Sequence, residues 1–304
     1  MQSARAGVLA MVTSCTVWGL SPLYYKLLAH VPPLEVLSHR TLWSAVFFTV
    51  VLLFQGRLGR LRDALGSLHS VVILGFAALM ISANWFMFIF SVQNGHTTEA
   101  SLGYYIYPLV AVLLGVVAFG ERLGRVQIFA VALAATAVVV LSVASGVAPW
   151  ISLLIALTFG LYSLVKKRVT VGPLVSVTAE VMLLSPLALG WLWHTHNGAG
   201  GAFGEDFATT ALLMFSGLLT AVPLILFTYA AQRVTLTTIG LVQYLNPTLQ
   251  FFCAVVIFGE AFGMVDAVAF GLIWTALGFY SAASMRQESA RRKASRTAAA
   301  VPSL

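Results

Sequence analysis

Ten long apolar runs are the feature that most constrains this chain. They cover residues 7–28, 36–54, 71–92, 99–119, 126–144, 148–165, 174–193, 209–231, 237–258 and 264–284. An α-helix needs about 20 consecutive apolar residues to cross the hydrocarbon core of a bilayer. The sequence therefore predicts an all-α integral membrane protein with ten transmembrane helices.

The low charge content agrees with a lipid environment. Of the 304 residues 60% are hydrophobic and 9% are charged, with a mean hydropathy of +0.93, whereas about a quarter of the residues in a soluble domain are charged. Cys15 and Cys253 both lie in apolar runs, which excludes a disulfide scaffold. The net charge of +7 comes from short basic clusters between the apolar runs. We therefore expect no nucleic-acid partner.

The basic residues also predict an orientation in the membrane. Ten spans place both termini on one side, and fifteen of the seventeen Lys and Arg residues fall on that side. Cytoplasmic loops carry the excess of Lys and Arg. We expect both termini in the cytoplasm and a location in a bacterial-type inner membrane.

The two halves of the chain resemble each other. A shift of 139 residues lays 102–142 on 241–281 and matches Tyr105 with Tyr244, Pro108 with Pro247, and the Phe-Gly-Glu of 119–121 with that of 258–260. Five spans per copy reverse the orientation, so we predict two inverted repeats, 7–144 and 148–284. A basic tail, 285–304, is expected to be cytoplasmic and disordered. Inverted repeats around a midplane site are typical of secondary transporters that work by alternating access.

Several motifs resemble the RarD branch of the EamA-type transporters, in the drug/metabolite transporter superfamily. They are WGLSPLYYK (18–26), EVLSHR (35–40), NW (84–85), NGHTTEASLGYYIYP (94–108), FGERL (119–123), FGLYSLVKKR (159–168) and QYLNPTLQF (243–251). The resemblance covers roughly residues 7–285. It implies two five-helix EamA repeats and export of small metabolites, such as amino acids, or of drugs. It does not identify the substrate.

Four ionisable residues fall within about two turns of the expected outer surface, where a charge in the hydrocarbon is a functional candidate: Lys26, His39, Arg40 and Glu99. A pair of Glu99 with Lys26 or Arg40 would form a gate or binding site. Alternatively, Lys26 and Arg40 extend to the headgroups and Glu99 caps its own helix. His39 would suit a proton sensor or a local hydrogen bond.

Glu180 is the other candidate, besides Glu99, for coupling transport to protons. It lies about two turns into the seventh run, and it either carries a proton or pairs with a base among residues 166–168. Glu121 and Glu260 follow the repeated glycine in each half, which favours helix capping over substrate contact.

Aromatic, amide and proline residues supply the remaining candidates for substrate binding or gating. Pro108, Pro223 and Pro247 fall within runs, where a proline frees a carbonyl or permits a bend. Amide and aromatic side chains at mid-depth would suit a zwitterionic or amide-bearing solute, although each can instead bond between helices. They are Trp18, Asn84, Tyr104, Tyr105, Gln243, Tyr244 and Gln250.

Other kinds of chemistry lack a motif. The sequence has no Gly-Lys dipeptide, and therefore no Walker A loop for ATP, and it has no His-Glu-x-x-His zinc motif. We expect no cofactor, metal or catalytic residue. The leading prediction is a secondary active transporter, with an ion or substrate gradient as the driving force. The alternatives are a membrane-embedded enzyme that uses His39, Glu99 or Glu180 as acid or base on lipid, and a passive channel.

Overall fold

The computed structural model describes residues 2–120, 124–145, 149–166, 169, 171–198, 200–231, 233 and 242–299, and every regular element in this part of the chain is a helix. The helices are α1 (Gln2–Gly19), α2 (Ser21–Leu27), α3 (Pro33–Phe54), α4 (Leu58–Ala64), α5 (Leu68–Gln93), α6 (Thr97–Phe119), α7 (Arg125–Ser145), α8 (Trp150–Lys166), α9 (Pro173–Asn197), α10 (Phe207–Ala231), α12 (Leu245–Phe252), the π-helix η1 (Cys253–Ile257) and α13 (Met264–Ala299).

Eight helices in the described residues are long and apolar enough to cross a membrane, and they coincide with eight of the ten expected spans. The expected sixth span corresponds to the shorter apolar helix α8, and the ninth to α12 and η1. Residues 234–241, where that ninth run begins, lie outside the described part. The amphipathic helix α4, in the basic segment after α3, was not expected; it packs Leu61 and Ala64 against α9.

Local sequence explains where several helices begin and end. Pro33 and Pro173 stand in the first turns of α3 and α9, where the missing N–H of proline has no helical partner to lose. Ser67 caps α5 by accepting a hydrogen bond from the Ser70 N–H. Gly120 ends α6 in the left-handed conformation, which glycine adopts without steric cost.

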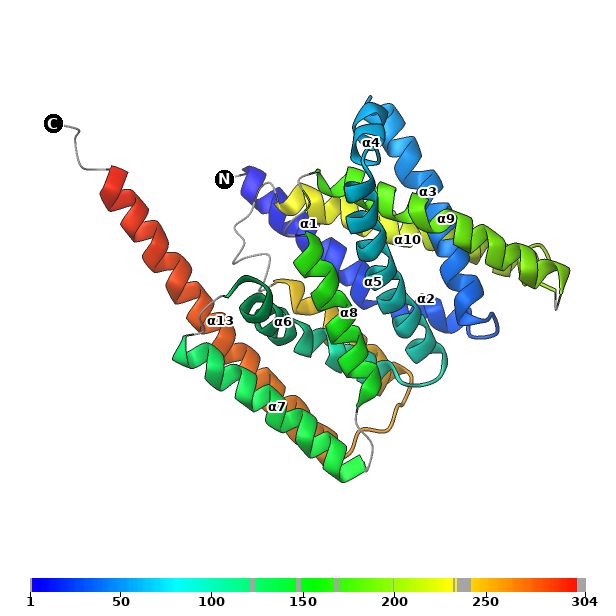
Figure 1. The fold of residues 1–304 in the computed structure, drawn as a ribbon. Helices are drawn as coiled ribbons and strands as arrows, with labels where there is room; N and C mark the ends of the chain where they lie inside the picture. The colour runs from blue at the N-terminus through cyan, green and yellow to red at the C-terminus, as the bar shows by residue number, and fades with distance from the viewer. Residues whose placement is uncertain are drawn as a thin grey trace.

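Each helix contacts neighbours from the other half of the chain. Helix α3 packs against both α9 and α10, while α8 packs against both α5 and α6. Helices α7 and α13 run side by side at one edge of the bundle, and α13 continues beyond it toward the C-terminus (Figure 1). The apolar contacts therefore connect the two halves rather than separating them into two independent units.

Helix α13 continues through Ala299, into the segment expected to be a basic tail. Residues 285–299 are rich in Ala and Arg, which have high intrinsic helix propensity. Helix α9 also extends to Asn197, so His194 and His196 belong to its last turn rather than to a loop.

Candidate functional site

Arg40 is a cation buried inside the bundle. It lies in the first half of α3, and its side chain is only 6% exposed. The Arg40 Nε donates a hydrogen bond to the Thr220 Oγ1 of α10 at 2.8 Å. The Arg40 Nη1 donates to the Tyr25 hydroxyl of α2 at 2.7 Å. The consecutive helices α2 and α3 and the distant helix α10 therefore position one guanidinium group.

Aromatic rings face the same guanidinium. Its Cζ lies 4.1 Å from the centroid of the Trp85 ring on α5 and 5.8 Å from that of Tyr25. A cation over an aromatic face gains about 2 kcal/mol or more when both are desolvated. Trp85 and Tyr25 therefore lower the free energy of the buried charge without neutralising it.

Arg40 forms no ion pair with any residue in the described ranges. The ion pairs there are His96 with Glu99 and Lys166 with Glu180. The hydrogen-bond acceptors of Arg40 are thus neutral hydroxyl groups. A buried charge without a counter-charge is costly, so this group is the strongest binding candidate in the structure.

Asn84 connects three helices close to this group. Its Nδ2 donates to the Ile155 carbonyl at 3.0 Å and to Thr158 Oγ1 at 3.3 Å, both on α8. Its Oδ1 accepts a hydrogen bond from the Tyr104 hydroxyl of α6 at 2.8 Å. The structure thus supports the interhelical role for Asn84, the alternative to substrate binding.

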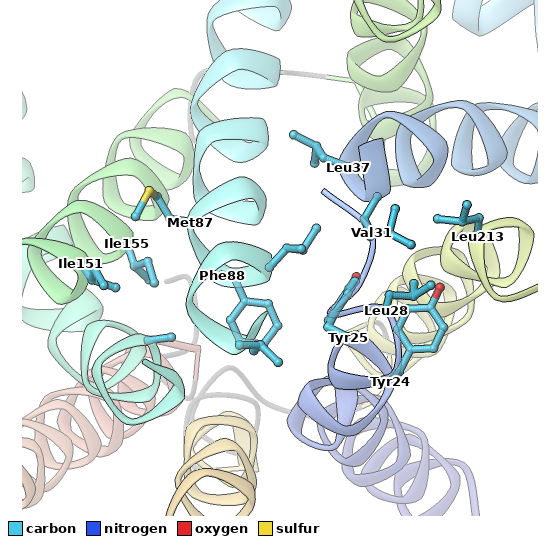
Figure 2. Packing of buried hydrophobic residues seen from close by; sticks show 14 residues of the cluster. Tyr24, Tyr25, Leu28, Val31, Leu37, Met87, Phe88, Ile151, Ile155 and Leu213 are labelled. Atoms are coloured by element: carbon cyan, nitrogen blue, oxygen red, sulfur yellow. The ribbon is translucent and has the colours of Figure 1, made fainter. Parts of the chain in front are cut away.

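A chain of aromatic rings joins Arg40 to Asn84. The Tyr25 and Phe88 centroids are 5.9 Å apart, those of Phe88 and Tyr104 5.8 Å, and those of Tyr104 and Phe159 5.9 Å, all edge to face. Figure 2 shows Tyr25 and Phe88 on facing helices within the same buried cluster. The region between α2, α5, α6 and α8 is therefore lined by aromatic side chains.

Glu180 forms a second buried polar group, on α9. It is 1% exposed, and its Oε1 lies 2.6 Å from the Lys166 Nζ at the end of α8. Ser176 donates to the same oxygen at 2.9 Å, and the Tyr162 hydroxyl donates to Oε2 at 3.2 Å. The pairing with a base of residues 166–168 is present, with Lys166 as the partner; Lys167 and Arg168 lie outside the described residues.

Glu99 does not contact Lys26 or Arg40. Its Oε1 lies 2.9 Å from the His96 Nδ1, in a partly exposed pair at the start of α6. Lys26 is exposed, and its Nζ lies 5.4 Å from the centroid of the Phe258 ring. The expected pairing of these charges is absent because Arg40 turns into the bundle while Glu99 remains at its end.

Glu260 caps α6 from the other half of the chain. Its two carboxylate oxygens accept hydrogen bonds from the Thr97 and Thr98 N–H groups, each at 2.7 Å, and from the Thr98 hydroxyl at 2.8 Å. The expectation of a capping role is confirmed for Glu260. Glu121, its counterpart in the first half, lies outside the described residues.

The segment before α10 covers the beginning of α3. The buried His39 ring stacks on Phe203 with centroids 4.7 Å apart, and its Nε2 has no hydrogen-bond partner in the described residues. The Glu35 Oε1 accepts a hydrogen bond from the Ala202 N–H at 2.7 Å. Asp206 ends this segment, and hydrogen bonds from Thr209 hold the pKa of its carboxyl group below the usual value. His39 is thus next to Arg40 in sequence, but its ring contacts Phe203 in the segment before α10.

The other expected site residues lie at helix contacts away from Arg40. Tyr105 contacts Thr248 through their hydroxyl groups at 2.7 Å, and Trp18 lies 6.2 Å from Phe227 between ring centroids. Gln250 Nε2 donates to the Asn246 side chain at 3.0 Å, while Gln250 Oε1 has no partner among the described residues. Gln243 and Tyr244 are half-buried and precede α12.

The three expected proline breaks differ in the structure: Pro223 lies inside α10, and its carbonyl accepts a hydrogen bond from the Ser14 hydroxyl at 2.7 Å. Pro108 lies inside α6, which continues on both sides of it. Pro247 lies in the first turn of α12, where it removes no intrahelical hydrogen bond. The Pro247 carbonyl instead accepts a hydrogen bond from the Ser101 hydroxyl at 2.9 Å. Pro247 therefore stands near the beginning of α12, in contact with α6.

Tyr25, Phe88 and Thr220 are the site residues that sequence reasoning missed. Tyr25 lies in the motif at 18–26, Phe88 is one of twenty phenylalanines, and Thr220 lies in the apolar run 209–231. No local pattern distinguishes such residues in a helix that is apolar on all sides. Only their common contact with Arg40 or its neighbours identifies them.

Comparisons with known proteins give a consistent result. A model of the EamA-like transporter family matches residues 5–143. The uncharacterized transporter YojE of Bacillus subtilis is 39% identical, covering 95% of this chain and 97% of YojE. Protein RarD of Streptomyces exfoliatus is 40% identical over 99% of this chain and 95% of its own length, and that of Escherichia coli 37% over 92% and 95%.

A solved structure has a similar fold. It is described as a crystal structure of protein, shares 18% sequence identity with this chain and superposes with a TM-score of 0.61. The match covers 93% of this chain and 99% of the other. At this identity it is evidence for the arrangement of helices alone.

Proposed function

Since the chain belongs to the EamA-like transporter family, in the branch that contains the RarD proteins, and is a multi-pass membrane protein, we propose that it is a secondary active transporter that exports a small amphipathic solute by alternating access. Arg40 carries this proposal: a charged, aromatic-lined group at the junction of four helices is a binding feature of membrane transporters. The family membership indicates a transporter, and Arg40 is the proposed binding site for the solute.

The pattern of helix contacts supports two inverted five-helix repeats. Exchange of the halves turns the contact of α1 with α10 into that of α8 with α5, and both occur. In the same way, the contact of α3 with α10 corresponds to the contact of α9 with α5. The contact of α6 with α8 corresponds to the contact of α12 with α1. All four contacts occur. A pseudo-two-fold relation of this kind gives the two similar but opposite arrangements that alternating access requires.

We assign separate roles to Arg40 and Glu180, two of the buried ionisable residues. Arg40, together with Tyr25, Trp85 and Thr220, would contact the solute. Glu180 would bind and release the coupling proton, because a carboxylate that can exchange its Lys166 partner for a proton links protonation to helix movement. The surplus of basic residues on one side supports an inner-membrane location with both termini in the cytoplasm.

Counterflow in proteoliposomes tests transport. Vesicles that contain the purified protein are loaded with an unlabelled amino acid or amphenicol, and the uptake of the same labelled compound is measured. We expect saturable uptake that a protein-free vesicle lacks. Uptake that never saturates and needs no internal solute would indicate a channel instead. Chemical conversion of added lipid without any solute movement would indicate an enzyme.

A further inference from the structure

We propose that the solute bound at Arg40 carries a carboxylate group and that the Arg40 guanidinium binds it directly. This inference rests on the proposed transport function and specifies its substrate class: an amphipathic organic anion whose apolar part meets the aromatic residues. The first argument is electrostatic. The described partners of Arg40 are two neutral hydroxyl groups and two aromatic rings, so the site keeps one uncompensated positive charge.

Hydrogen-bonding capacity provides the second argument. A guanidinium group has five N–H donors in a fixed plane. The contacts given by the described residues use one N–H of Nε and one of Nη1. Three donors remain, and a carboxylate accepts two parallel N–H groups in a bidentate pair. An amide or an amine offers no comparable pair of charged acceptors.

The second half of the chain contains a buried charge that has a counter-ion within the protein. A shift of 140 residues lays Pro33-Leu34 on Pro173-Leu174 and Arg40 on Glu180. At the Glu180 position the protein provides its own counter-ion, with the Lys166 Nζ 2.6 Å from the carboxylate. At the Arg40 position no described residue provides one. We attribute the missing negative charge to the solute.

Rigidity of the arginine is the third argument. Thr220 and Tyr25 hold the guanidinium from two sides, while Trp85 lies against its face at 4.1 Å. A cation that is already oriented loses little conformational entropy when a ligand binds. The same contacts hold the Arg40 side chain inside the bundle, whereas Lys26 is exposed.

Ligand-dependent thermal unfolding of the purified protein in detergent tests the charge requirement. The probes are phenylacetate, benzoate and hexanoate, each compared with its neutral amide, and phenylalanine, compared with its amide, which loses the carboxylate but keeps the ammonium group. Phenethylamine, sodium chloride and phosphate, at equal ionic strength, are further controls. We expect at least one carboxylate to raise the unfolding temperature in a saturable way. Equal shifts from the amide, shifts from inorganic anions only, or no shift from any carboxylate would overturn the proposal.

Three variants test whether Arg40 is the residue that binds the carboxylate. Arg40→Gln should raise the half-saturating carboxylate concentration on the order of tenfold or more, the loss expected for a charge-assisted pair. Arg40→Lys keeps the positive charge and should bind the carboxylate with intermediate affinity. It also serves as the test variant if Arg40→Gln does not fold. Lys26→Gln removes an exposed positive charge and should bind like the wild type. An unchanged affinity in folded Arg40→Gln would contradict the proposal.

Transport separates this inference from the function on which it rests. Counterflow of neutral or cationic solutes that is the same in wild type and Arg40→Gln would keep the transporter and refute the anion site. Carboxylate binding at Arg40 with no counterflow of that carboxylate would keep the site and refute the transport of that solute.

Discussion

Arg40 and Glu180 are buried charges of opposite sign, and each is the eighth residue of its helix, α3 or α9. Arg40 on α3 has neutral partners, whereas Glu180 on α9 has Lys166. The cost of burying an ion falls when a counter-ion is close. Arg40 can therefore pair with a charged ligand. Glu180 already has a counter-ion within the protein, and it becomes free only if a proton or a helix movement replaces Lys166.

Glu180→Gln tests the coupling role. Glutamine keeps the size of the side chain and one carbonyl oxygen that can accept from either Ser176 or Tyr162, but it cannot bind and release a proton as a carboxylate does. We expect counterflow exchange to persist while uptake driven by a pH gradient falls to the level of solute equilibration, measured in the same vesicles. Glu99→Gln removes the exposed carboxylate next to His96 and should leave both activities unchanged. Gradient-driven uptake that survives in Glu180→Gln would refute the coupling role.

At the scale of helices, glycine allows α10 to approach α3. A Cβ added at Gly217 would lie 2.5 Å from the Trp43 carbonyl carbon, an atom of the α3 backbone. Small residues permit such close contacts between membrane helices. This contact matters to the site because α3 supplies Arg40 and α10 supplies Thr220.

Gly217→Ala should therefore destabilise the protein by about 1–3 kcal/mol, the usual cost of overpacking. Gly75→Ala is the matched control, because a Cβ at Gly75 on α5 meets no atom within 4 Å. The control should be neutral or slightly stabilising, since alanine favours the helix by about 0.5–1 kcal/mol. Thermal unfolding in detergent measures both. Equal unfolding temperatures for the two variants would show that α10 moves away without cost.

The cap that Glu260 places on α6 is the second contact between elements that we test. Glu260→Ala removes three hydrogen bonds to one carboxylate, and we expect a loss of about 1–3 kcal/mol. Amide exchange at Thr97 and Thr98 should become faster, which gives a local measurement. Asp266→Ala is the control, because Asp266 caps its own helix α13 through Gly263. Unchanged exchange at Thr97 would mean that the cap does not hold α6 in solution.

At the scale of the whole molecule, the interlocked contacts of the two halves fit one transport unit in a single chain. We predict that both termini face the cytoplasm. A fluorescent protein fused after Leu304 should fluoresce, and alkaline phosphatase fused at the same place should be inactive. Glu205→Cys, in the segment before α10, should react with a membrane-impermeant thiol reagent from outside. Gln55→Cys, between α3 and α4, should react only after permeabilisation. The opposite pattern would reverse the assigned orientation.

Much of the architecture follows from the sequence, but the contacts of the polar residues do not. The family motifs predicted the EamA membership that the comparisons confirm, and eight spans matched long apolar helices. The repeated Gly-Glu motif correctly predicted that Glu260 is a cap. The expected pair of Glu99 with Arg40 did not form, because proximity in depth says nothing about which way each helix faces.

The sequence by itself determined the membrane environment, the position of most helices, the family and the charge imbalance along the chain. These properties depend on composition and local order, which a single chain displays directly. Only the tertiary structure decided that Tyr25, Trp85 and Thr220 surround Arg40 and that Lys166 neutralises Glu180. The physical reason is rotational: the polar residues of α3, among them Glu35, His39 and Arg40, are spread around the helix, so its pattern favours no face. The direction of each polar side chain is fixed only when neighbouring helices pack against it.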